Sequence, residues 1–164
     1  PDMSVKENIS INTLDTVSSW CGISKRKEIT KAEEIIKAYN VKTSDLNKEI
    51  KFLSGGNQQK VIIGRSTCTE PKILIFDEPT KGIDIGAKTE VYRLMKELAE
   101  KGIAIILISS EMDEIKKCAN RIICMYHGEV TGECTYGSEK EEILKAILGI
   151  KTSDEEGQTD EQRV

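Results

Sequence analysis

LSGGNQQKVIIGRSTCTEPKILIFDEPTKGID, residues 53–84, is the stretch that decides the fold. Ser54-Gly55-Gly56 places a hydroxyl and two residues without Cβ before a segment, residues 57–69, that has the pattern of a helix. The N–H groups at a helix start are unpaired and carry about half a positive charge, so they attract oxyanions. Glycine lets that backbone come close to a ligand. The stretch predicts a phosphate cradle, although Ser-Gly-Gly alone is an ordinary helix cap.

The second part of the stretch has the pattern of a strand that ends in acids. Lys72–Phe76 is a short apolar run, typical of a strand buried on both faces, and Asp77-Glu78-Pro79 follows it. Ligands of open α/β sheets gather at the carboxyl ends of strands. One carboxylate there can hold Mg²⁺, and its neighbour can take a proton from an attacking water. We therefore expect Asp77 to be a metal ligand and Glu78 a catalytic base.

Helices and strands alternate along the rest of the chain. Apolar spacing predicts helices at residues 25–40, 41–52, 87–98 and 112–119, and strands at residues 73–76, 103–108 and 121–126. This order indicates an α/β fold with a parallel sheet and right-handed crossovers. The ends of the first two strands would then lie side by side, which places Ser109-Ser110-Glu111 next to Asp77-Glu78.

The C-terminal part has local turn signals. His127-Gly128 predicts a hairpin turn between two apolar runs, and His127 is expected to be a turn residue and not a catalytic one. Ser138 with Glu141 indicates a capping box for a last helix that Gly149 ends. Residues 151–164 are polar and acid-rich, which predicts a disordered tail.

A family becomes recognisable from these motifs. LSGGNQQK resembles the signature motif of ABC ATPases, ILIFDEP looks like their Walker B strand, and KGID falls where that family has its D-loop. LSGGNQQKV with DEPTKGIDIGAK and ISSEM is similar to the second ABC half of monosaccharide-importer ATPases of the ribose, galactose and xylose type. The resemblance runs from Met3 to about Gly149. It implies part of a P-loop NTPase (RecA-like) core with an α-helical subdomain at residues 1–70 and core at residues 71–150.

The resemblance also implies roles for the site residues. In a two-half ATPase the signature of one half closes over ATP in the other, which assigns nucleotide binding to Ser54, Gly55, Gly56, Asn57, Gln58 and Asp84. Asp77 would hold Mg²⁺, and Glu78 would position or deprotonate the water. Ser110 stands where most of the family has a histidine, and a serine can donate one hydrogen bond but cannot become a cation. We expect slower hydrolysis in this half than in its partner.

The sequence contains no P-loop. The GxxxxGK[ST] pattern is absent, and the nearest run, residues 82–88, has the wrong spacing and follows an acidic turn. The chain begins at Pro1, which suggests a fragment of a longer protein. Phosphate hydrogen bonds contribute about 1.5–3 kcal/mol each, against association costs of at least about 4 kcal/mol. We therefore expect the isolated chain to bind ATP weakly or not at all, and to be inactive.

Composition argues against several other classes. The net charge of −4, with cations scattered among acids, does not favour nucleic acid as a partner. The longest aliphatic run, residues 103–108, is far shorter than the about 20 residues that span a bilayer, and no export leader opens the chain. Five cysteines without CxxC and a single histidine do not favour zinc and suggest reduced thiols. Trp20 either touches a membrane partner or anchors a small helical layer, and the second interpretation is favoured.

The resemblance implies an enzyme, the ATPase subunit of an importer that couples ATP hydrolysis to monosaccharide uptake. Its cofactors would be ATP and Mg²⁺. Its partners would be another ABC half or second ATPase subunit, transmembrane permease subunits and, indirectly, an external sugar-binding protein, at the cytoplasmic face of the plasma membrane. Two alternatives are a regulatory half that completes the partner's ATP site and a soluble ABC protein of translation or repair. The latter would need a basic surface or long heptads, which the sequence lacks.

Overall fold

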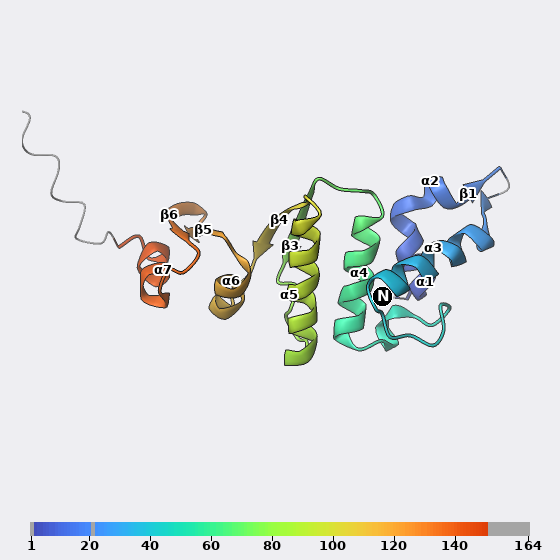
Figure 1. The fold of residues 1–164 in the computed structure, drawn as a ribbon, viewed down its shortest axis with the longest axis horizontal. Coiled ribbons are helices and arrows are strands. Elements are labelled where there is room, and N and C mark those ends of the chain that lie inside the picture. Colours follow the sequence, from blue (N-terminus) through green and yellow to red (C-terminus); the bar gives the residue numbers. More distant parts are fainter. Residues whose placement is uncertain (1, 21, 151–164) are drawn as a thin grey trace, which may run out of the picture. The chain divides into compact units, whose positions relative to one another are not determined.

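The computed structural model describes residues 2–20 and 22–150, so the predicted tail lies outside the described residues. The chain divides after Ile108 into two compact units, which are described separately below (Figure 1). This division differs from the expected one at residue 70 between a helical subdomain and the core, which stays a prediction. None of the described helices is long and apolar enough to cross a membrane.

The first unit begins with a layer of helices. In chain order these are α1 (Val5–Ser10), the 3-10 turn η1 (Ile11–Thr13), α2 (Leu14–Val17), α3 (Lys25–Ala38) and α4 (Gly55–Thr67). α1 packs against both α3 and α4 and buries Val5 and Ile9 completely. Asn40, with a φ of 48°, follows the end of α3, as predicted.

The helix expected at residues 41–52 is wrong. The segment contains only a 3-10 turn, η2 (Ile50–Phe52), among its described residues. Thr43 donates its hydroxyl to the carbonyl of Asp45 at 3.0 Å, and the Asp45 carboxylate accepts from the backbone N–H of Asn47 at 2.8 Å. Such local bonds give the backbone an alternative to a helix.

A short hairpin projects from the helical layer. Its strands are β1 (Ser18–Ser19) and β2 (Gly22–Ile23), and Ser19 lies opposite Gly22. Trp20 follows β1 directly and is 100% exposed. The favoured interpretation of Trp20 as an anchor of the layer is therefore wrong, because the hairpin carries the indole beyond the helices.

A parallel pair of strands completes the first unit. β3 (Ile73–Asp77) and β4 (Ala104–Ile108) pair with each other, and α5 (Ile85–Glu100) connects them along the chain. Asp77 lies opposite Ile108. The α5 helix buries one stripe at helical spacing, formed by Val91, Leu94, Met95 and Leu98. The predicted parallel pairing is confirmed.

Burial of these two strands on both faces was expected and is wrong for this chain. Ile73, Ile75, Ile106 and Ile108 are 57%, 65%, 48% and 50% exposed. Phe76 points the other way and is buried. Side chains alternate between the faces of a strand, and the described residues cover one face only.

The second unit is a hairpin with two helices. Its elements are α6 (Met112–Cys118), β5 (Arg121–Tyr126), β6 (Glu129–Thr135) and α7 (Lys140–Ile147). His127 and Gly128 have φ values of 48° and 85°, so the predicted hairpin turn is confirmed. The core of the unit consists of Ile122, Cys124, Cys134 and Ile143.

The predicted capping box of the last helix is wrong. The N-cap of α7 is Glu139, one residue after Ser138, and no side chain bonds the first turn. The Glu139 carboxylate instead pairs with Lys116 at 3.6 Å. Gly149, with a φ of 68°, follows the helix end as predicted.

Candidate functional site

Helix α4 contains most of the LSGGNQQK motif and is the signature helix. Ser54, its N-cap, is exposed and extended, with φ −61° and ψ 151°. Helix α4 starts at Gly55, two residues earlier than expected, so both glycines lie in its first turn. No side chain caps this turn. The first N–H groups therefore keep their capacity to bind an anion.

The hydroxyl of Ser54 is oriented by its neighbour. Asn57 donates its side-chain N–H to the Ser54 Oγ at 2.8 Å. Because the oxygen accepts this bond, its own hydrogen remains available as a donor. Asn57 is held in turn by the backbone N–H of Lys42, which donates to its Oδ1 at 2.7 Å.

Gln58 has a similar supporting position. Its side-chain N–H donates to the carbonyl of Leu53 at 2.8 Å and so ties the residue before Ser54 to the helix. The structure thus gives Asn57 and Gln58 protein partners that position Ser54. Their predicted contact with a nucleotide stays a prediction.

Close packing between helices also explains why residues 55 and 56 are glycines. A Cβ on Gly55 would lie 2.8 Å from the Cγ2 of Ile83, and one on Gly56 would lie 2.5 Å from the Cβ of Ala87. Helices α4 and α5 lie side by side at this point (Figure 1). The sequence suggested that glycine brings phosphate close, but here glycine brings the signature helix close to the start of α5.

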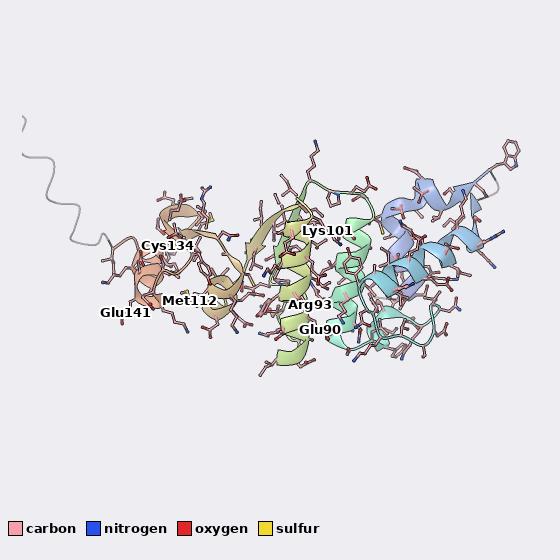
Figure 2. The ribbon with its side chains drawn as sticks, viewed as in Figure 1. Glu90, Arg93, Lys101, Met112, Cys134 and Glu141 are labelled. Atoms are coloured by element: carbon pink, nitrogen blue, oxygen red, sulfur yellow. The ribbon has the colours of Figure 1, made fainter. Side chains whose placement is uncertain are left out.

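A buried lysine joins the same two helices. Lys60, the last residue of LSGGNQQK, is 3% exposed and forms an ion pair with Glu90 of α5. It also donates to the carbonyl of Asn40 at 3.1 Å. The bond from Lys60 lowers the pKa of Glu90, whose side chain Figure 2 labels on α5.

Sequence reasoning missed this pair, although a signal was present. Lys60 lies four residues after Gly56 and four before Gly64, hence on the same helix face. A Cβ on Gly64 would lie 2.4 Å from the Cγ2 of Ile35, so this face is buried along its length. Glycines at that spacing indicate a closely packed face.

The acidic turn has an unusual backbone. Glu78 has a φ of 46°, in the left-handed region that glycine and asparagine favour. Its N–H donates to the carbonyl of Ile108 at 2.9 Å, and its carbonyl accepts from Lys81 at 3.2 Å. These bonds on both sides hold a conformation that costs about 1–2 kcal/mol for a residue with a Cβ.

Asp77 is the residue that best fits a metal. Its carboxylate is exposed at the end of β3 and has no ion pair or hydrogen bond within the described ranges. Nor do the described residues gather three His, Cys, Asp or Glu side chains that could hold an ion. One free carboxylate suits Mg²⁺, which typically takes one or two protein carboxylates and fills its shell with phosphate oxygens and waters.

Asp84 and Ser110 complete the set of predicted residues. Asp84 is the N-cap of α5, and its Oδ1 accepts from the backbone N–H of Ala87 at 2.9 Å. This helix cap is a role that sequence reasoning did not assign. Ser110 belongs to the second unit, where the neighbouring Ser109 hydroxyl accepts from the N–H of Glu111 at 3.0 Å. The predicted place of Ser110 beside Glu78 stays a prediction.

Comparisons with known proteins identify the family. Residues 1–81 match the ABC transporter family. The ribose import ATP-binding protein RbsA of Caldanaerobacter subterraneus subsp. tengcongensis is 45% identical over 148 residues, which are 88% of this chain and 30% of that protein. This chain belongs to the ABC transporter family.

Solved ABC cassettes have the same fold. The dimeric ATP-binding cassette MJ0796, in a post-hydrolysis state bound to ADP and Pi, has a TM-score of 0.69 and 25% identity, over 85% of this chain and 59% of its own. A nucleotide-free cassette of an ABC transporter has a TM-score of 0.71 and 26% identity, over 90% of this chain and 59% of its own. The predicted family and its P-loop NTPase fold are thus confirmed.

This ABC chain spans only part of its relatives. It covers 30% of the length of the ribose import protein and 59% of the two cassettes. An uncovered face of the β3–β4 pair is what a partial cassette would have, because ABC cassettes of this fold contain more residues than the chain does.

Proposed function

We propose that this chain is the C-terminal part of the second ABC half of an importer ATPase that couples ATP hydrolysis to uptake of a monosaccharide. The 45% identity to a ribose import ATP-binding protein supports this proposal most directly. ATP and Mg²⁺ would be its cofactors. Permease subunits would hold it at the cytoplasmic face of the plasma membrane, with an external sugar-binding protein as an indirect partner.

The signature residues would act on the nucleotide of the opposite half. The N–H groups at the start of α4 and the hydroxyl of Ser54 would donate to the γ-phosphate. The bond from Asn57 to Ser54 supports this assignment, because it leaves the hydroxyl hydrogen available. Asp84 would lie at the interface between the halves.

The acidic turn would act on the nucleotide of its own half. Asp77 would hold Mg²⁺, which neutralises charge on the phosphates when it is bound. Glu78 would accept a proton from the attacking water. The water oxygen forms a bond to the γ-phosphorus as the bond between that phosphorus and ADP breaks. The left-handed backbone of Glu78, bonded to Ile108 and Lys81, would fix the direction of its side chain. Ser110 would donate one hydrogen bond near the γ-phosphate.

The test is ATP turnover of the full-length protein with Glu78→Gln. Glutamine keeps the shape but cannot take the proton, so we expect turnover to fall at least about 100-fold while ATP binding persists. Glu33→Gln, on the exposed side of α3, is the control and should leave turnover unchanged. Equal turnover of the Glu78→Gln variant and the wild type would refute the catalytic assignment. The comparisons give no support to the alternative of a purely regulatory half.

A further inference from the structure

The hairpin tip of the helical layer exposes apolar side chains. Trp20 is 100% exposed, Ile23 is 53% exposed and Leu14, on the adjoining α2 helix, is 42% exposed. A fully exposed indole is an unusual feature, because tryptophan normally buries most of its surface. The tip therefore presents an apolar group that none of the described residues covers.

A cationic run follows the hairpin directly. Lys25, Arg26 and Lys27 open α3 and are all exposed, and none of them forms an ion pair with a described residue. Glu28, the next residue, does not offset them outside, because it is 6% exposed and faces inward. There it accepts from the Ser10 hydroxyl at 3.0 Å and pairs with Lys6 at 3.8 Å. The outer surface is thus locally positive in a chain whose net charge is −4.

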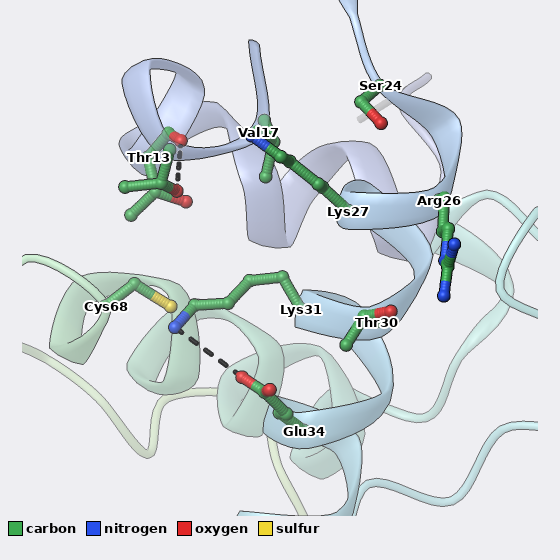
Figure 3. Close-up of a pocket in the computed structure, with 10 residues that line it drawn as sticks. Thr13, Val17, Ser24, Arg26, Lys27, Thr30, Lys31, Glu34 and Cys68 are labelled. Carbon is green, nitrogen blue, oxygen red and sulfur yellow. Dashed lines mark hydrogen bonds and ion pairs between the residues drawn. The ribbon is translucent and has the colours of Figure 1, made fainter. Parts of the chain in front are cut away.

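A cavity of about 570 Å³ lies at the base of the same hairpin. Val17 and Ser24, which flank the hairpin strands, line it together with Thr16, Arg26, Lys27 and Thr30. Figure 3 shows Lys27 reaching across this cavity toward Val17. Glu34 also lines the cavity, but it pairs with Lys31 at 3.8 Å. The remaining hydroxyls and the cations Arg26 and Lys27 suit the phosphate of a lipid headgroup.

From these features we propose that the tip, residues 14–20 and 22–27, binds the surface of an anionic phospholipid membrane. Trp20 would lie at the level of the headgroups, where indoles are enriched at membrane surfaces. Arg26 and Lys27 would contact lipid phosphates beside it. Apolar contact and basic charge are the two signals that together give stable attachment without a spanning helix.

A lipid surface fits this tip better than a folded protein partner does. A stable protein interface needs about 800 Å² on each side with close shape complementarity. A single protruding indole among flexible lysines provides little such area. A fluid bilayer needs no matching shape, and its negative charge complements the exposed cations.

The single tryptophan of the chain is a built-in reporter. The 164-residue chain is mixed with vesicles of phosphatidylglycerol and phosphatidylcholine, or of phosphatidylcholine alone, at low and high salt. We expect a blue shift of Trp20 emission and co-sedimentation with the anionic vesicles only, and both should weaken at high salt. No shift with anionic vesicles at low salt, or equal binding to both vesicle types, would overturn the proposal.

Three variants separate the tip from the rest of the chain. The triple variant Lys25→Glu, Arg26→Glu, Lys27→Glu should lower binding by about 100-fold or more, since each cation contributes several-fold. Trp20→Ser should also lower co-sedimentation. The control triple Lys37→Glu, Lys101→Glu, Lys145→Glu makes the same change in net charge at exposed positions elsewhere and should bind much more tightly than the tip variant.

Other sources of binding give different results. If Trp20→Ser sediments like the wild type, Trp20 takes no part in the membrane contact and the proposal is wrong. If inorganic phosphate alone produces the same emission shift as the vesicles, the cavity binds free phosphate and the lipid assignment is wrong. Folding of each variant is checked by its far-UV circular dichroism.

Discussion

The Cβ of Ala87, in the first turn of α5, lies 2.5 Å from the position that a Cβ on Gly56 of α4 would occupy. The signature helix and the helix after the D-loop are therefore fitted to each other at a point where neither can add an atom. Gly55 makes a second close approach, to Ile83. Both neighbours lie within or next to the D-loop, so the packing of the signature helix fixes the position of that loop.

Gly56→Ala should therefore destabilise the chain. Alanine is the better helix former by about 1 kcal/mol, so helix propensity alone predicts stabilisation. Overpacking against Ala87 should outweigh it and give a net loss of about 1–2 kcal/mol in the free energy of unfolding, measured in urea. Gly55→Ala should cost less, because it meets the end of the flexible Ile83 side chain.

The double variant Gly56→Ala, Ala87→Gly tests the cause. It removes the atom that the new Cβ meets and should recover part of the loss, since residues in contact are not additive. If Ala87→Gly lowers the free energy of unfolding by the same amount in the Gly56→Ala variant as in the wild type, the two positions are uncoupled and the packing argument fails.

The buried pair of Lys60 and Glu90 should respond unequally to removal of its two members. Glu90→Gln leaves a buried ammonium with neutral acceptors only, the Asn40 carbonyl and the glutamine amide oxygen, and should cost about 1–3 kcal/mol. Lys60→Met removes the buried charge itself and should cost less, because the remaining carboxylate is 42% exposed. The control is Glu97→Gln, which breaks the exposed pair with Arg93 and should cost under about 0.5 kcal/mol. Equal losses for all three variants would contradict this order.

The same pair gives a pH dependence. The bond from Lys60 lowers the pKa of Glu90 below its ordinary value of 4.5, so its stabilisation is present above that pH. It is lost as the pH falls through the lowered pKa of the folded state. We expect the stability difference between the wild type and Glu90→Gln to be constant near neutral pH and to shrink below about pH 4.5. A difference that grows on acidification would contradict the sign of the shift.

The thiol of Cys118 should react slowly. Burial, and to a smaller extent the charge of Glu114, raises its pKa to about 11. At pH 8 only about one thiol in a thousand would then be ionised, and the rate of alkylation should rise about tenfold per pH unit. Glu114→Gln should speed alkylation of Cys118 more than the exposed control Glu141→Gln does, as followed by peptide mass spectrometry. Fast alkylation of Cys118 in the folded wild type would contradict the raised pKa.

The sequence predicted this structure where one local pattern determines one local element. The parallel strands, the His127-Gly128 turn and the helix ends at Asn40 and Gly149 follow from apolar runs and from residues that tolerate a positive φ. The motif order also predicted that the signature helix, strand and acidic turn occur together. These features depend on neighbours in the sequence.

Two errors are local, the helix expected at residues 41–52 and the capping box at Ser138, and the others concern which segment covers which surface. Periodicity shows that Ile73 and Ile75 are apolar but not whether anything in the chain covers them, and both are exposed. Tryptophan at position 20 suggested an anchor, but the hairpin carries it outward. Lys60 was read only as part of the LSGGNQQK motif, and its burial was not predicted. That burial depends on Glu90, which lies 30 positions further along the chain. Spacing can indicate that a face is closely packed, but it does not identify the distant segment that packs against it.

Ser110 offers a test of catalysis by this half. In the full-length protein, Ser110→His would restore a side chain that can become a cation, and we expect faster turnover, by several-fold or more. Ser110→Ala removes the hydrogen-bond donor and should slow turnover. Ser44→His, at an exposed site in the loop before the signature, is the control for an added imidazole and should change nothing. If all three variants hydrolyse ATP at the wild-type rate, Ser110 has no part in the reaction, and the slower hydrolysis expected of this half must have another cause.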